Sequence, residues 1–261
     1  MKPTRRTFIK AAGLAALGLG IKPTIDLVGG GQHIEASSQA AAEPTAATKR
    51  WAMVVDTTKC PEGCTDCIDA CHHTHNVPHF DNPKEEVKWI WHDSYEHVFP
   101  DQENEFARKG LNDLSVLLMC NHCDNPSCVR VCPTKATFKR AQDGIVMMDM
   151  HRCIGCRFCM AACPYGSRSF NWKDPRLGLD MKNLNPDYPT RTRGVVEKCT
   201  FCAERIDKGL NPACVEACKK KALVFGNVED PESPVRKLLD ANYTLRRRVE
   251  LGTGPRVYYI V

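Results

Sequence analysis

The residues of this 261-residue chain with the clearest chemistry are its sixteen cysteines, because their spacing sorts them into four groups of four. Every group ends in two cysteines with three residues between them, and no cysteine is left over. The groups are Cys60, Cys64, Cys67 and Cys71; Cys120, Cys123, Cys128 and Cys132; Cys153, Cys156, Cys159 and Cys163; and Cys199, Cys202, Cys214 and Cys218. Cysteines at such short, repeated spacing bind metals or form disulfides.

The third group points to iron–sulfur clusters. It has the bacterial ferredoxin spacing C-x2-C-x2-C-x3-C-P, with Pro164 after the last cysteine. In that spacing a tight turn presents three thiolates to one [4Fe–4S] cluster, and the fourth cysteine ligates a neighbouring cluster. We therefore predict that the chain holds four [4Fe–4S] clusters and that the groups exchange their last ligands in pairs. Spacing alone does not choose which groups are partners.

Two other uses of the cysteines are open at this point. Exported proteins with an even number of cysteines commonly form disulfides, so one alternative is a disulfide-stapled structural or binding protein without iron. Four near-copies of one spacing disfavour it, because disulfide scaffolds scatter their cysteines. Structural zinc takes four ligands in two separated pairs, whereas Cys153, Cys156 and Cys159 place three within seven residues.

The N-terminus resembles an export signal sequence. Arg5 and Arg6, followed by "TFIK" and a short apolar run, resemble the twin-arginine signal. The run from Ala11 to Ile21 is about half the length of a membrane-spanning helix. We predict a twin-arginine signal segment over residues 1–40 and a periplasmic location, or one on the extracytoplasmic face of the cytoplasmic membrane. No other stretch is long and apolar enough to span a membrane.

Composition narrows the function further. The net charge is +5, and residues 1–40 carry three of these charges, so the rest of the chain is close to neutral. There is no basic face with interleaved aromatic residues, so binding of nucleic acid is not predicted. All the thiolates are assigned as ligands, and no paired carboxylates or nucleotide-binding loop are present. We expect electron transfer rather than catalysis by this chain alone.

The expected secondary structure is a mixture of short elements, an α+β fold. "VVDTTKC" (54–60) and "MMDMHRC" (147–153) repeat an apolar pair and an aspartate before a first cysteine, as flanking strands would. Residues 136–149 predict a hairpin, "PSCVRVC" and "PACVEAC" predict short helices, and the alternation of Val87, Trp89 and Trp91 predicts a strand. Ser233 and Pro234 predict the start of a helix, and "PRVYYIV" predicts a strand.

These elements indicate two tandem ferredoxin-like modules over residues 51–226, a double domain that carries all four clusters. Residues 72–119 and 164–198 would be long insertions, and residues 227–261 a C-terminal extension. Histidines concentrate in and near the first insertion, where they either handle protons or ligate haem, or form hydrogen bonds around negatively charged clusters; we favour the hydrogen-bonding interpretation. They are His72, His73, His75, His79, His92, His97 and His122.

Over roughly residues 50–261 the chain resembles the periplasmic four-cluster iron–sulfur subunits of membrane-bound oxidoreductases. "CTDCIDACHHTHNVP", "CNHCDNPSCVRVCPT", "CPYGSRSFNWKDPR" and "LGTGPRVYY" are most similar to the exported iron–sulfur subunit of the sulfite-reduction-associated membrane complex of dissimilatory sulfur metabolism. One departure from bacterial ferredoxins is that His72 and Lys219, not proline, follow the last cysteines of the first and fourth groups.

The resemblance implies which groups are partners, the first with the fourth and the second with the third. The implied ligand sets are Cys60, Cys64, Cys67 and Cys218; Cys71, Cys199, Cys202 and Cys214; Cys120, Cys123, Cys128 and Cys163; and Cys132, Cys153, Cys156 and Cys159. It also implies partners: an integral quinone-interacting subunit of the polysulfide-reductase anchor type, a triheme cytochrome c, a b-type cytochrome and a heterodisulfide-reductase-like subunit. The alternative within electron transfer is the iron–sulfur subunit of a molybdopterin reductase of the polysulfide, nitrite or dimethyl sulfoxide type.

Overall fold

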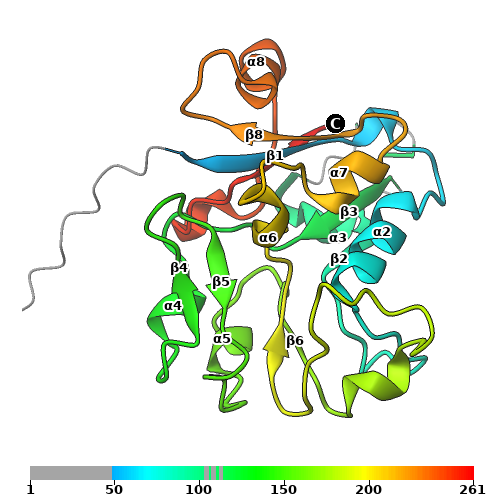
Figure 1. Ribbon diagram of the computed structural model, residues 1–261. Helices are drawn as coiled ribbons and strands as arrows, with labels where there is room; N and C mark the ends of the chain where they lie inside the picture. The colour runs from blue at the N-terminus through cyan, green and yellow to red at the C-terminus, as the bar shows by residue number, and fades with distance from the viewer. Residues whose placement is uncertain (1–48, 103–105, 107–109, 112–113) are drawn as a thin grey trace, which may run out of the picture. The chain divides into compact units, whose positions relative to one another are not determined.

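The computed structural model describes residues 49–102, 106, 110–111 and 114–261 (Figure 1). The predicted signal segment, with Arg5 and Arg6, lies outside the described residues. No helix in the described ranges has the length and apolar character needed to cross a membrane.

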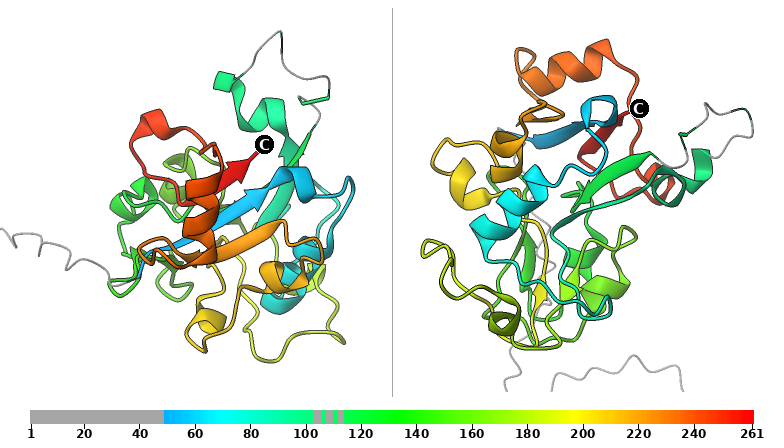
Figure 2. Two further views of the ribbon diagram at one scale, coloured as in Figure 1. Left: turned by 90° about the horizontal axis from the view of Figure 1, so that it is seen from above. Right: turned by 90° about the vertical axis from the view of Figure 1, so that its right-hand side faces the viewer.

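The largest sheet of the described residues has three strands. Strand β1 (Trp51–Asp56) is central, with β8 (Leu223–Asn227) antiparallel on one side and β9 (Val257–Ile260) parallel on the other. Successive side chains of a strand face opposite sides of its sheet. Ala52 and Val54 accordingly join a small cluster under helix α8 (Pro234–Ala241), whereas Met53 and Val55 join the main core. Figures 1 and 2 show α8 on one face and the cysteine-bearing helices on the other.

Two pairs of short helices carry cysteines toward each other. Helix α2 (Asp66–His75) packs against α7 (Ala213–Ala217), although the two are far apart in the sequence. Helix α4 (Ser127–Arg130) packs against α5 (Phe158–Ala161). The helices predicted over "PSCVRVC" and "PACVEAC" are therefore confirmed.

Small antiparallel pairs complete this layout. The predicted hairpin is confirmed as β4 (Thr137–Lys139) with β5 (Val146–Met148). In residues 164–198, β6 (Ser169–Phe170) pairs with β7 (Val196–Glu197), and one 3₁₀ turn, η3 (Pro175–Gly178), interrupts otherwise irregular loops. Short elements at the loop ends are η1 (Thr57–Lys59), α6 (Ala203–Ile206) and η4 (Val249–Leu251).

The strand predicted over residues 87–91 starts later than its alternation suggested. Strand β2 (Ile90–Ser94) pairs with β3 (Ser115–Met119) and is followed by α3 (Tyr95–Val98) and η2 (Pro100–Gln102). Val87 and Trp89 are buried but precede the ladder. The backbone N–H of Lys88 donates to Ser169 Oγ at 2.8 Å, and the Trp89 indole N–H donates to a Glu197 carboxylate oxygen at 2.9 Å. Side-chain partners on another loop therefore replace strand pairing there.

The helix and the strand predicted near the C-terminus are both observed. The Ser233 hydroxyl accepts the Arg236 backbone N–H at 3.1 Å, and Pro234 is the first residue of α8. Strand β9 then joins the sheet beside β1. The last residues of the chain thus share a sheet with the strand that leads into the first cysteine group.

Candidate iron–sulfur sites

The structure gathers the sixteen cysteines, all of them free thiols, into four sites of four. At three of the sites the four cysteines line a cavity. At the fourth site the cysteines are buried in the core, close enough to shift one another's pKa. Site I is Cys60, Cys64, Cys67 and Cys218; site II is Cys71, Cys199, Cys202 and Cys214; site III is Cys120, Cys123, Cys128 and Cys163; site IV is Cys132, Cys153, Cys156 and Cys159.

Helix geometry explains why each group of the sequence contributes to two sites. Cysteines four positions apart on a helix lie one turn from each other, with their Cβ atoms about 5–6 Å apart. On α2, Cys67 faces site I and Cys71 faces site II. On α7 and at its C-cap the order is reversed, because Cys214 belongs to site II and Cys218 to site I. The packed helix pair therefore places two sites side by side. At sites III and IV, Cys128 lies on α4 and Cys159 on α5, and Cys132 and Cys163 follow just beyond the helix ends to reach the neighbouring site.

Left-handed residues shape the loops between the first cysteines of a group. Phe201 (φ 56°) and Gly155 (φ 68°) lie in such loops. A Cβ on Gly155 would lie 2.4 Å from the Gly194 carbonyl oxygen, so this position has no room for a side chain. The turns direct backbone N–H groups at sulfur: that of Phe201 donates to Cys199 Sγ at 3.4 Å. Such donors offset negative charge on a ligating thiolate.

The same repeat leads the chain into sites I and IV. An Asp56 carboxylate oxygen accepts the Thr58 backbone N–H at 3.2 Å, and Asp149 accepts the His151 backbone N–H at 2.9 Å. Each aspartate also pairs with the basic residue three positions on, Lys59 or Arg152. The matching segments "VVDTTKC" and "MMDMHRC" therefore form matching turns.

The electrostatics of the sites disfavour thiolates that have no cation beside them. Burial, followed by repulsion from Cys60, Cys218 and Cys64, raises the pKa of Cys67 to about 12. Burial and then the charges of Cys199, Cys214 and Cys202 raise the pKa of Cys71 well above its ordinary value. Without a metal these thiols would stay protonated at neutral pH, so four thiolates could lie this close only around a positive charge such as that of iron. Four convergent thiols with N–H donors to sulfur are the donor set of a [4Fe–4S] cluster.

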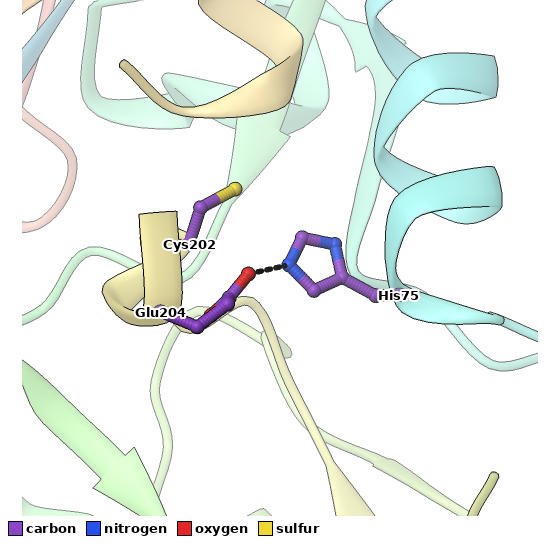
Figure 3. Close-up of side chains that lie close together, drawn as sticks. All are labelled: His75, Cys202 and Glu204. Atoms are coloured by element: carbon purple, nitrogen blue, oxygen red, sulfur yellow. Dashed lines mark hydrogen bonds and ion pairs between the residues drawn. The ribbon is translucent and has the colours of Figure 1, made fainter. Parts of the chain in front are cut away.

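Helix α2 also brings a histidine to site II (Figure 3). His75 is 1% exposed; its Nε2 lies 2.8 Å from a Glu204 carboxylate oxygen and its Nδ1 2.9 Å from the Cys71 carbonyl oxygen. One ligand atom each of His75, Cys202 and Glu204 lie within 4.8 Å of one another. Because Cys202 belongs to site II and the other two side chains bind each other, the trio borders site II and is not a separate metal site. The ring of His75 stacks on Trp89 at 4.7 Å.

Two contacts at site III could not be predicted from the spacing of the cysteines. Arg168, 5% exposed, donates from its guanidinium to Cys128 Sγ at 3.0 Å. The C-terminal segment closes over the first loop of the site, where the Asp124 backbone N–H donates to the Gly254 carbonyl at 2.9 Å and Arg256 pairs with the Asp124 carboxylate at 2.6 Å. "LGTGPRVYY" was informative as a resemblance, but its contact with the second cysteine group follows only from the fold.

Fold and sites together define an iron–sulfur protein, and comparisons with known proteins agree. The 4Fe–4S dicluster domain matches residues 115–177 and 184–228. The chain is 42% identical to the Hdr-like menaquinol oxidoreductase iron-sulfur subunit 1 of Archaeoglobus fulgidus, over 98% of this chain and 97% of that protein. It is 39% identical to the menaquinone reductase iron-sulfur cluster-binding subunit of Nitratidesulfovibrio vulgaris, over 81% of this chain and 88% of that protein. The arsenate respiratory reductase iron-sulfur subunit of a Shewanella species is 39% identical over 81% of this chain and 96% of its own length.

The chain therefore belongs to the family of iron–sulfur electron-transfer subunits of oxidoreductase complexes. Within such a complex it transfers electrons and is not the catalytic subunit. The coarser prediction from the sequence, an iron–sulfur electron carrier with an α+β fold, is confirmed.

Proposed function

We propose that each of the four sites holds one [4Fe–4S] cluster with the four thiolates named above as its ligands. The observation that carries this proposal is the exchange of ligands. In each packed helix pair, the cysteines at either helix are divided between the two neighbouring sites. The pairs α2–α7 and α4–α5 then correspond to two tandem ferredoxin-like modules. When bound, each cluster supplies one-electron redox chemistry.

The protein's own residues order the sites into a line. Sites I and II share α2 and α7, and sites III and IV share α4 and α5. Sites II and III meet where Cys199 is an electrostatic neighbour of Cys120 and the ring of His122 stacks on Phe201 at 3.7 Å. Cys60 of site I is partly exposed and Cys156 of site IV is exposed, so electrons would enter and leave at sites I and IV.

The particular complex we propose is a membrane complex of dissimilatory sulfur metabolism that exchanges electrons with menaquinone. Support comes from the 42% identity, over nearly the whole of both chains, with a subunit named for an Hdr-like menaquinol oxidoreductase. The chain would connect an integral quinone-interacting subunit with a triheme cytochrome c. It would act on the extracytoplasmic face after export through the twin-arginine signal of residues 1–40, which "TRRTFIK" supports.

A second candidate is the electron-transfer subunit of a molybdopterin reductase. Relatives named for arsenate respiratory reductase and dimethyl sulfoxide reductase, at 39% and 38% identity, favour it equally. The two candidates share the four clusters and differ in the partner.

Isolation of the complex from detergent-solubilised membranes through a tag on this chain separates the candidates. Haem c without molybdenum supports the quinone–cytochrome complex, and molybdenum without haem c supports the reductase. Iron should reach about sixteen atoms per chain, four per cluster. An iron-free, folded chain would contradict both candidates. Replacing Arg5 and Arg6 by lysine should leave the chain in the cytoplasm if the export proposal is right.

A further inference from the structure

Three buried basic side chains lie at site III or at its junction with site II, and among the described residues none of them forms an ion pair with a carboxylate. They are Arg168, Lys198 and Arg247, which are 5%, 0% and 7% exposed. A buried charge without a counter-charge is strongly destabilising, so each must be balanced by another anionic group. The anionic group that all three lie near is the thiolate set at site III and at its junction with site II.

Arg168 is in direct contact with this set. It lies between sites III and IV, because Cys128 and Cys120 of site III and Cys159 of site IV are all among its charged neighbours. One guanidinium nitrogen donates to Cys128 Sγ at 3.0 Å, and another donates to the Thr137 hydroxyl at 3.1 Å. Its other contacts are with Met148 Sδ and with Cys159 of site IV, so the shortest contact of this side chain with a ligand sulfur is the one at site III.

The other two cations come from different segments of the chain. The Lys198 ammonium donates to the carbonyls of Val146 and Cys199, which places its charge at the junction of sites II and III. Arg247 lies over the ring of Tyr165 at 5.5 Å and has Cys163 among its charged neighbours. Site III is thus approached by fixed positive charge from three elements of the chain.

Carboxylates do not cancel this charge. Asp124, which follows Cys123, is bound by both Arg256 and Arg50 at 2.6 and 2.5 Å. At site II the neighbouring charges are of both signs, because Cys199 has Lys198 and Glu204 as neighbours and Cys202 has Glu204 and Arg205. His75 Nε2 lies 2.8 Å from a Glu204 carboxylate oxygen, and no arginine donates a hydrogen bond to a site II sulfur in the described residues.

We propose that site III holds the highest-potential centre of the four, and that Arg168 is the main residue that makes it so. The inference rests on the proposed function, since it presupposes clusters at the four sites. Reduction adds one negative charge to a centre, and a fixed positive charge in a water-poor interior stabilises that charge. An electron that enters at either end of the line would therefore reside at site III, one of the two inner sites of the line.

The test is a redox titration of the isolated complex, followed by electron paramagnetic resonance, with iron measured on the same samples. Cys123→Ser, which removes a site III ligand, identifies the site III signal. In the unaltered chain that signal should be the first to develop as the potential is lowered. Arg168→Met should reduce the equilibrium constant for reduction of site III by about tenfold or more, which is about 59 mV for a one-electron couple. Arg168→Lys should restore most of it.

Arg157→Gln is the matched control. Arg157 is exposed beside site IV, so solvent screens its charge and the site III signal should keep its potential. If Arg168→Met loses iron, Arg247→Gln decides, with a smaller shift in the same direction expected. Full iron with an unmoved site III potential, or a site III signal that develops after the others, overturns this inference and leaves the proposed function intact. An unaltered chain without iron overturns both.

Discussion

The I–II half and the III–IV half of the protein use the same helix exchange but surround it with different side chains. Around site II the insertions supply aromatic rings and balanced charge: Trp89 and Tyr188 pack on His75, and Arg191 pairs with Glu197 at 2.7 Å, with both side chains 2% exposed or less. Around site III the chain supplies Arg168 without a carboxylate partner. Both halves thus supply four cysteines to each site, whereas the loops between the groups set the charge that those cysteines experience.

The largest expected effect comes from removing a cysteine that one group supplies to the neighbouring site. Cys71→Ser should remove the iron of site II, about a quarter of the total, although Cys71 belongs to the same sequence group as three site I ligands. Iron analysis with site-resolved paramagnetic resonance checks this. The matched variant in the other half is Cys163→Ser, which should deplete site III and spare site IV. Loss of the site I signal in Cys71→Ser would contradict the exchange.

Next in size is the buried ion pair that anchors the insertion beside site II. Arg191→Met leaves Glu197 buried without its cation and should lower the free energy of unfolding by about 3–5 kcal/mol. Denaturant unfolding of the purified protein measures this. Arg176→Gln, which alters an exposed ion pair with Asp174, should leave the free energy of unfolding almost unchanged, because solvent screens the pair. Equal effects of the two variants would show that the Arg191–Glu197 pair does not hold the insertion.

A smaller effect is expected at the loop of site IV. Gly155→Ala meets the Gly194 carbonyl and must hold a left-handed φ, so we expect a loss of roughly 2–4 kcal/mol from clash and strain together. Gly209→Ala has the same φ region with nothing within 4 Å, and should lose only about 1 kcal/mol. Thermal unfolding compares them, and the site IV iron should be lost first in Gly155→Ala.

The smallest effect distinguishes the two matching aspartate turns. Burial would raise the pKa of Asp56, but hydrogen bonds from Lys59 and Thr58 outweigh it and hold that pKa below its usual value. A depressed carboxyl pKa stabilises the fold above the unfolded value, about pH 4, and the contribution is lost as pH falls through the folded value. Asp56→Asn should therefore cost about 1 kcal/mol at pH 7 and progressively less in acid.

Asp149→Asn is the control in the other half. Its side chain is 30% exposed against 9% for Asp56, so solvent competes for the same contacts and the cost should be smaller. Unfolding curves between pH 3 and pH 7 (roughly the range over which carboxyls titrate) measure both variants. A loss that grows toward low pH would contradict the sign of the Asp56 effect.

Much of the fold was readable in the sequence, because it depends on local spacing. The hairpin over residues 136–149, the short helices that carry cysteines and the helix capped by Ser233 all formed where residue patterns predicted them. The strand over residues 87–91 was misplaced at its start, because Lys88 and Trp89 bind side chains of a loop some eighty residues or more away in the chain. Periodicity cannot report a partner at that separation.

The sequence by itself determined the chemistry. Sixteen thiols in four groups of short spacing can bind few kinds of cofactor, because one tight turn then presents several thiols to the same metal centre. The tertiary structure alone decided which groups adjoin, because α2 meets α7 and α4 meets α5 only after long loops have closed. It also decided the charge at each site. Arg168, Lys198 and Arg247 are ordinary basic residues in the sequence, and they become unpaired cations beside thiolates only when packing removes them from water.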